Sequence, residues 1–331
     1  MIVGVIGGGQ LGRMLALAGI PLGLSFRFLD PAQGAPAGEV GELLVGAYDD
    51  PELLDRLADG AEAVTYEFEN VPVEAARRVG AIPEAAALEA AQDRLVEKQL
   101  FRRLGIPTVR IDDEVERFPA LLKTRRLGYD GKGQQLVSTH DAGSVPEHVL
   151  EERVDFSREL SILAVRGRDG DTRFWPLVEN VHEGGILRTS RAPAAGAPQA
   201  EAEDYATRLL DDLGYVGVLA LELFEVEGGL LANEFAPRVH NTGHWTIEGA
   251  ATSQFENHLR AILGLPLGPT DSRASFMANL IGDAPPAGEV LRLPGAHLHL
   301  YGKEPRPGRK LGNVTLVEAR AASEDALLAL L

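Results

Sequence analysis

The segment NEFAPRVHNTGHW, residues 233–245, decides the fold because it places one carboxylate, one arginine and two histidines around a single turn. A second carboxylate, Glu222, lies within the apolar run LALELF at residues 219–224, and two glycines separate the two runs. This pattern predicts a β-hairpin. With the turn centred on Gly228, Glu222 faces Glu234, and both carboxylates lie on one face because strand side chains alternate.

The two opposed carboxylates predict a site for Mg²⁺, with Mn²⁺ as an alternative ion. Mg²⁺ prefers oxygen ligands and usually completes its octahedron with nucleotide phosphates and water, so two carboxylates suit a metal–ATP site. The alternative is that Glu222 and Glu234 are edge-strand glutamates on a solvated face. A register shift of one residue would separate their side chains.

Composition restricts the class of protein. A chain of 331 residues is expected to form two or three domains, and 45% hydrophobic residues indicate a globular protein. The 32 basic against 49 acidic residues give a net charge of −17, which argues against nucleic-acid binding. The chain has no cysteine, which excludes disulfides and a thiol nucleophile. We expect a cytoplasmic enzyme without membrane contact, because no stretch approaches the roughly 20 apolar residues of a span.

The N-terminal sequence predicts a parallel α/β domain. Residues 2–6 are a continuous apolar run that ends in the glycine turn GGGQLG at 7–12, and helical periodicity follows. Further strands are predicted at 24–30 and 63–67, with a helix at 51–58 between them. This order is typical of a small doubly wound domain.

The remainder of the chain predicts a different class of fold. A single helix is expected from about 85 to 104, followed by short strands around a glycine-rich turn at 128–133. After these, strands and helices follow in an order typical of a largely antiparallel sheet, so the fold class is α/β and α+β. The assigned domains are 1–93, a Rossmann-like domain; 94–155, the linking helix and a small lid; and 156–331, a domain with a mixed, largely antiparallel sheet.

The first glycine turn leaves several interpretations open. Gly7, Gly9 and Gly12 match G-x-G-x-x-G, and Asp30 ends the next predicted strand, where a dinucleotide-binding fold would bind a ribose. An NAD-dependent oxidoreductase is therefore one alternative. The same turn also suits a substrate phosphate, or only a tight turn, because any helix N-terminus offers free N–H groups. Gln10 adds an amide that can bind a small substrate.

The second glycine turn, GYDGKG at 128–133, predicts phosphate binding. Backbone N–H groups of such a turn can close over phosphates, and Lys123 on the preceding strand supplies charge. Lys98, the stretch EERV at 151–154 and Glu159 complete what ATP requires: cations for phosphates, a backbone for adenine and a carboxylate for ribose. The alternatives are a flexible hairpin and ordinary surface charge.

These motifs together resemble the 5-(carboxyamino)imidazole ribonucleotide synthase family of ATP-grasp enzymes. The similarity runs in order from the turn at 7–12 to about Asn313, and it is most specific in the turn at 128–133, the segment PRVHN at 237–241 and the basic run at 303–310. It implies an ATP-grasp fold with a pre-ATP-grasp N-terminal domain, and a homodimer. It also implies that bicarbonate attacks the γ-phosphate of Mg-ATP to give carboxyphosphate. This intermediate would carboxylate the amine of aminoimidazole ribonucleotide in purine biosynthesis and release ADP and phosphate.

The resemblance also implies residue roles. Glu222 and Glu234 would hold Mg²⁺, Arg238 would bind bicarbonate or carboxyphosphate, and the groups near the reacting amine would be His240, Asn241 and Asp130. The nucleotide would be bound by Lys98, Lys123, Gly128, Tyr129, Asp130, Gly131, Lys132, Gly133, Gln134, Glu151, Glu152, Arg153, Val154, Glu159, His182, Asn233 and Glu234. The ribonucleotide would be bound by Gln10, Glu67, Lys303, Arg306, Arg309 and Lys310, the last four forming a dense basic cluster suited to a phosphate.

Three rival functions remain open at this point. The nearest is another ATP-grasp ligase that joins a carboxylate to an amine, such as a formate-dependent transformylase. A non-catalytic nucleotide sensor would keep the same ligands. The NAD-dependent oxidoreductase is disfavoured, because hydride chemistry gives no role to Glu222, Glu234 and Arg238 together.

Overall fold

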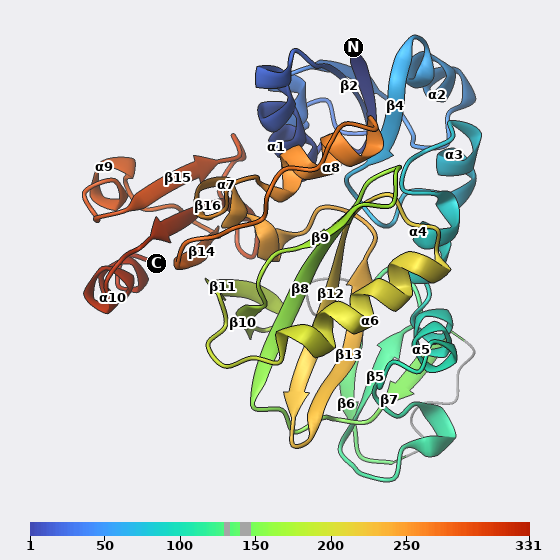
Figure 1. The fold of residues 1–331 in the computed structure, drawn as a ribbon, viewed down its shortest axis with the longest axis vertical. Helices are drawn as coiled ribbons and strands as arrows, with labels where there is room; N and C mark the ends of the chain where they lie inside the picture. The colour runs from blue at the N-terminus through green and yellow to red at the C-terminus, as the bar shows by residue number, and fades with distance from the viewer. Residues whose placement is uncertain (129–132, 140–146) are drawn as a thin grey trace.

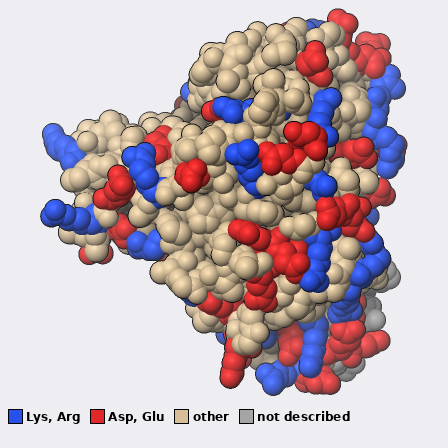
Figure 2. Space-filling model, in the orientation of Figure 1, with Lys and Arg blue, Asp and Glu red and all other residues tan. Residues whose placement is uncertain are grey.

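The computed structural model describes residues 1–128, 133–139 and 147–331 (Figure 1). Tyr129, Asp130, Gly131 and Lys132 lie outside the described residues. Within the described ranges, no helix is long and apolar enough to cross a membrane. Acidic and basic side chains are interspersed on the face shown in Figure 2.

The N-terminal domain is a four-stranded parallel sheet with the order β3-β2-β1-β4. Its elements are β1 (Ile2–Ile6), α1 (Gln10–Gly19), β2 (Ser25–Asp30), β3 (Glu42–Val45), α2 (Pro51–Ala58), β4 (Ala61–Tyr66) and α3 (Val73–Arg78). The central strand β1 is buried over Val3 to Ile6, as its continuous apolar run predicts. Sequence analysis missed β3, a four-residue edge strand in which only Leu44 is fully buried.

The predicted helix at 85–104 is wrong in one respect, because the structure divides it into α4 (Ala85–Ala91) and α5 (Arg94–Arg103). The division falls at Gln92 and Asp93. Asp93 has an extended backbone and caps α5 by accepting a hydrogen bond from the Leu95 N–H at 3.1 Å. An N-cap aspartate begins a new helix, which explains the interruption of an otherwise helical pattern.

The lid is a three-stranded antiparallel sheet with the order β6-β5-β7. Its strands are β5 (Ala120–Thr124), β6 (Gln134–Val137) and β7 (His148–Glu151). Figure 1 shows this small sheet beside α5, at the end of the molecule opposite the N-terminal domain. All three strands fall within the range predicted for the lid.

The largest sheet contains nine antiparallel strands in the order β13-β12-β8-β10-β11-β14-β16-β15, with β9 paired to β8. Its strands are β8 (Arg158–Arg166), β9 (Thr172–Phe174), β10 (Val178–Glu183), β11 (Ile186–Ala192), β12 (Gly217–Val226), β13 (Gly229–Ala236), β14 (Ser275–Ile281), β15 (Ala296–Leu300) and β16 (Lys310–Val317). The accompanying helices are α6 (Gln199–Asp212), α7 (Thr246–Gly249), α8 (Gln254–Ile262), α9 (Ala287–Val290) and α10 (Ala321–Leu328). The predicted antiparallel sheet is thus confirmed.

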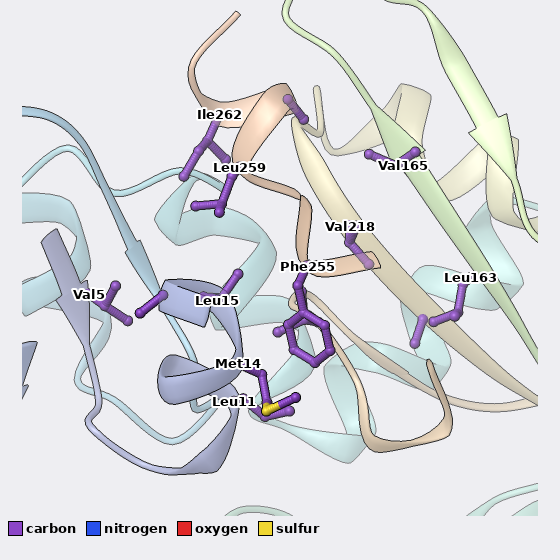
Figure 3. Close-up of a cluster of buried hydrophobic side chains, with 14 of the residues drawn as sticks. Val5, Leu11, Met14, Leu15, Leu163, Val165, Val218, Phe255, Leu259 and Ile262 are labelled. Atoms are coloured by element: carbon purple, nitrogen blue, oxygen red, sulfur yellow. The ribbon is translucent and has the colours of Figure 1, made fainter. Parts of the chain in front are cut away.

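Helix α8 joins the N-terminal domain to the large sheet. Phe255 and Leu259 pack in one buried cluster with Leu15 of α1, Leu163 of β8 and Val218 of β12 (Figure 3). Burial of such large apolar side chains stabilises the junction by about 2 kcal/mol each. The two domains therefore share a core.

Candidate functional site

The hairpin of β12 and β13 places Glu222 directly opposite Glu234, as predicted. The reason differs from the expectation of a turn centred on Gly228. Val226 pairs with Gly229, and this two-residue turn alone would put Glu222 opposite Asn233. An irregularity beside Glu222 makes Asn233 an extra residue, and such a bulge restores the pairing of the two glutamates.

These carboxylates line a cavity of about 570 Å³ between the N-terminal domain, the lid and the large sheet. Most of the described candidates line it as well. They are Gln10, Glu67, Lys123, Gly128, Gln134, Glu159, His182, Glu222, Asn233, Glu234, Arg238, His240, Asn241 and Lys310. Residues from the whole length of the chain therefore converge on one cavity.

The carboxylate pair is electrostatically asymmetric. Burial alone would raise the pKa of Glu234, but Arg94 and Lys123 lower it, and Arg94 Nη1 donates to Glu234 Oε2 at 2.8 Å. The pKa of Glu222 is raised by burial and by the charge of Glu234. Two close carboxylates that repel each other are a suitable place for a divalent cation.

Arg238 and His240 lie beside this pair. The Arg238 Nε and Nη2 groups contact Glu69 Oε2, while Nη1 donates to the backbone oxygen of Val239 at 2.8 Å. His240 Nε2 is 3.4 Å from Glu222 Oε1, and burial together with Arg238 lowers the pKa of His240 well below its usual value. The imidazole is therefore neutral at physiological pH.

Several polar atoms of the site are buried without a partner among the described residues. They are Asn233 Oδ1, His240 Nδ1 and Asn241 Nδ2. Buried polar atoms in native proteins are nearly always hydrogen-bonded. All three residues line the cavity, although these particular atoms have almost no accessible surface.

The basic loop between β15 and β16 reaches the N-terminal glycine turn. Lys303 Nζ donates to Gln10 Oε1, so residues 293 positions apart meet at the cavity. Arg309 Nη1 donates to the backbone oxygen of Glu304 at 3.1 Å, and Arg306 is exposed. Of the four predicted basic residues, only Lys310 lines the cavity itself.

Three family models match consecutive parts of the chain. They describe a ribonucleotide synthetase preATP-grasp domain over residues 1–92, an ATP-grasp domain over 108–255 and a phosphoribosylaminoimidazole carboxylase C-terminal domain over 275–326. The N5-carboxyaminoimidazole ribonucleotide synthase of Pseudomonas aeruginosa is 51% identical, with 99% of each chain covered. The chain belongs to the N5-carboxyaminoimidazole ribonucleotide synthase family.

Solved structures of this synthase family have the same fold. The synthetase of Thermus thermophilus is 56% identical with a TM-score of 0.93, covering 100% of this chain and 97% of that one. The synthase of Aspergillus clavatus, in complex with ADP and 5-aminoimidazole ribonucleotide, is 31% identical with a TM-score of 0.89, covering 99% and 97%. The predicted ATP-grasp fold with a pre-ATP-grasp domain is confirmed, and the chain is an ATP-grasp ligase.

In this member of the synthase family, the predicted role of Lys98 needs correction. Lys98 has no exposed surface and does not line the cavity. Its Nζ donates to the backbone oxygen of Asn233. The same nitrogen is 3.7 Å from Glu97 Oε2 and 3.9 Å from Glu151 Oε1. The cation that α5 directs to the cavity is Arg94, one helical turn earlier, which sequence reasoning overlooked.

None of the residues 151–154, the stretch predicted to bind adenosine, lines the cavity. Glu151 is buried behind it, where its Oε2 is 2.5 Å from Lys123 Nζ. Burial alone would raise the pKa of Glu151, but Lys123 and Lys98 lower it to about 2. Glu152 and Val154 line a separate pocket of about 270 Å³, and Arg153 is exposed. The side chain of Glu151 therefore holds the lysines, so adenosine contacts by its carboxylate are not expected.

The remaining nucleotide candidates lie on β8 and β10, on the same side of the sheet order as the Glu222 strand. His182 Nδ1 of β10 bonds Glu159 Oε2 of β8, and both side chains line the cavity. Burial alone would lower the pKa of His182, but the bond to Glu159 raises it above its usual value. Gly133 follows the undescribed part of the glycine turn and does not line the cavity. The binding roles of these residues stay predictions.

The first glycine turn does not have the open N–H groups that a dinucleotide needs. Gly9 N–H and Gly12 N–H donate to the Glu67 carboxylate at 2.9 and 3.1 Å, and Gly8 N–H donates to Asp30 Oδ2 at 2.8 Å. Internal carboxylates thus fill the place where a pyrophosphate would bind. This geometry contradicts the NAD alternative, and it engages the Glu67 carboxylate in the turn while Glu67 still lines the cavity.

Proposed function

We propose that this chain carboxylates the exocyclic amine of 5-aminoimidazole ribonucleotide, using ATP and bicarbonate, and releases ADP and phosphate. The observation that carries the proposal is the pairing of Glu222 with Glu234 in the same cavity as Arg238. The Aspergillus clavatus relative, whose structure holds ADP and 5-aminoimidazole ribonucleotide, supports the same substrates for this chain. De novo purine biosynthesis is the corresponding pathway.

The residues present fit Mg²⁺, which would be held by Glu222 and Glu234. Their mutual repulsion and cavity position match a hard cation that takes its remaining ligands from phosphates and water. Bound there, Mg²⁺ would neutralise charge that develops on the phosphoryl oxygens. Lys123 and Arg94 extend the positive charge along the cavity wall and would bind the phosphates.

Arg238 would bind bicarbonate next to the phosphates, because it lines the same cavity as Glu222 and Glu234. A bicarbonate oxygen attacks the γ-phosphorus, the bond to ADP breaks, and carboxyphosphate forms. The substrate amine then attacks the carboxyl carbon, and phosphate leaves with the bridging oxygen. His240 and Asn241 line the same cavity as Arg238, and the unprotonated His240 ring can accept a proton from the amine.

The proposal predicts strict dependence of ADP release on both co-substrates. Purified protein with Mg-ATP should release ADP rapidly only when bicarbonate and the ribonucleotide are both supplied, apart from slow uncoupled hydrolysis. Equal rates with formate in place of bicarbonate would favour the transformylase. ATP binding without any stimulated turnover would favour a nucleotide sensor. A coupled spectrophotometric assay in carbonate-depleted buffer distinguishes the three.

Lys303 makes ribonucleotide binding sensitive to pH. Burial lowers the pKa of Lys303 to about 8, and neighbouring Arg309 and Lys310 contribute. Lys303 is mostly charged below its pKa and mostly neutral above it. Its attraction for the substrate phosphate therefore weakens as pH rises through about 8. We expect kcat/KM for the ribonucleotide to fall roughly tenfold by pH 9.5, and to stay nearly constant in Lys303→Arg. An identical decline in both proteins would contradict this assignment.

A homodimer in the cytoplasm is also proposed. The family resemblance supports the dimer, and the absence of cysteine suits a reducing compartment. Sedimentation equilibrium should give twice the 35.5 kDa mass of one chain.

A further inference from the structure

The loop that follows β4, residues 67–72, links the N-terminal domain to the Arg238 end of the cavity. Its two carboxylates have separate partners. Glu67 accepts hydrogen bonds from the first turn of α1, and Glu69 contacts Arg238 across a sequence separation of 169 residues. Both side chains line the cavity. The loop therefore connects the glycine turn at one end to the proposed bicarbonate ligand at the other.

Gln92, at the interruption between α4 and α5, fixes the backbone of this loop. Its Nε2 donates to the backbone oxygen of Glu69 at 2.8 Å and to that of Val71 at 2.7 Å. Both hydrogens of one side-chain amide are thus used on the loop. The helix interruption consequently has a second role beyond starting α5, because it holds Glu69 in place.

Glu69 restricts the orientation of the Arg238 guanidinium. Glu69 engages Nε and Nη2, and the Val239 backbone oxygen engages Nη1, so all three guanidinium nitrogens have a partner. A guanidinium carries five N–H groups, which leaves others for an anion. Arg238 is only 9% exposed, and a buried cation without a carboxylate partner would be strongly disfavoured.

We propose that Glu69 is a positioning residue that orients Arg238 for bicarbonate, with Gln92 supporting it through the loop backbone. This inference rests on the proposed function. Because Glu69 belongs to the same loop as Glu67, it also sets the bicarbonate ligand relative to the N-terminal part of the ribonucleotide site. The N-terminal domain thereby contributes to bicarbonate binding without touching the anion.

Steady-state kinetics of Glu69→Gln test the proposal. The substitution keeps the shape and removes the charge, so KM for bicarbonate should rise about tenfold or more, which corresponds to about 1.4 kcal/mol. At saturating bicarbonate, kcat should stay within about threefold of wild type, and KM for ATP should not change. Glu69→Asp, which keeps the charge, should recover part of the affinity. Glu74→Gln is the matched control, because Glu74 is exposed and pairs with Arg77 of its own helix, α3.

Gln92→Met is a second variant that keeps both charges. Gln92→Met should also raise KM for bicarbonate, but by less than Glu69→Gln does. If Glu69→Gln does not fold, Gln92→Met provides the test of the positioning role. A lower kcat with unchanged KM for bicarbonate would mean that Glu69 acts on the reacting atoms. An equal rise in all three KM values would indicate a merely structural role. Either result overturns the inference, as does wild-type behaviour of both variants. A wild-type enzyme without bicarbonate-dependent turnover would instead overturn the proposed function on which it rests.

Discussion

Glu234→Gln is expected to lower kcat on the order of 1,000-fold, since metal stabilisation of phosphoryl charge is worth several kcal/mol. The amide keeps the size of the side chain but loses the charge that would hold Mg²⁺. Stability should change by no more than about 1 kcal/mol, because the Glu234 side chain is 41% exposed to the cavity and the loss of its attraction to Arg94 is offset by relief of its repulsion with Glu222. Steady-state ADP release and urea denaturation measure the two quantities.

Glu227→Gln is the control for that experiment. Glu227 is exposed in the turn of the same hairpin and does not line the cavity, so both activity and stability should be unchanged. Unfolding of Glu234→Gln would show that Glu234 is a structural residue, and full activity in it would show that Glu234 is not a metal ligand.

Lys98→Met is expected to cost about 3 kcal/mol of unfolding free energy, as does breaking other buried ion pairs. Lys98 is completely buried between Glu97 and Glu151, and it holds the Asn233 backbone that forms the bulge. Burial raises the pKa of Glu97 to about 8 even though the charge of Lys98 lowers it. Removing Lys98 therefore leaves the buried Glu97 carboxylate with less compensating positive charge. The shift in the midpoint of chemical denaturation measures the cost.

Arg94→Met should show the opposite pattern. Loss of its proposed contact with the ATP phosphates should weaken ATP binding roughly tenfold to a hundredfold, with stability within about 1 kcal/mol of wild type. Arg103→Met, at the other end of α5, removes a surface pair with Asp212 and serves as the control for both variants. Weak ATP binding by a fully stable Lys98→Met protein would restore the original prediction for Lys98.

The sequence pattern alone was sufficient to predict the helices and strands whose hydrophobic pattern is uninterrupted. Strand β1, the two strands β12 and β13 that carry Glu222 and Glu234, and helix α2, which begins at Pro51, all occur where the sequence indicates. The opposition of Glu222 and Glu234 was predicted correctly, although it depends on a bulge at Asn233 that no turn rule indicates. Without the bulge, the same turn would have separated the pair.

The features that sequence reasoning missed are tertiary. Arg94 and Lys98 lie one turn apart on α5, and only the packing of that helix against β13 decides which one faces the cavity. Glu69 contacts Arg238 from another domain, a pairing that no local pattern reports. Likewise no local pattern indicates that the Glu67 oxygens accept hydrogen bonds from backbone N–H groups of the glycine turn.

The central claim is that ATP activates bicarbonate at this cavity, and transfer of an oxygen isotope tests it most directly. With ¹⁸O-labelled bicarbonate, Mg-ATP and the ribonucleotide, carboxyphosphate formation places one bicarbonate oxygen on phosphorus. Mass spectrometry of the phosphate released in an early quench should therefore find one ¹⁸O in each molecule. Phosphate without ¹⁸O, in which the fourth oxygen comes from water, would contradict the account.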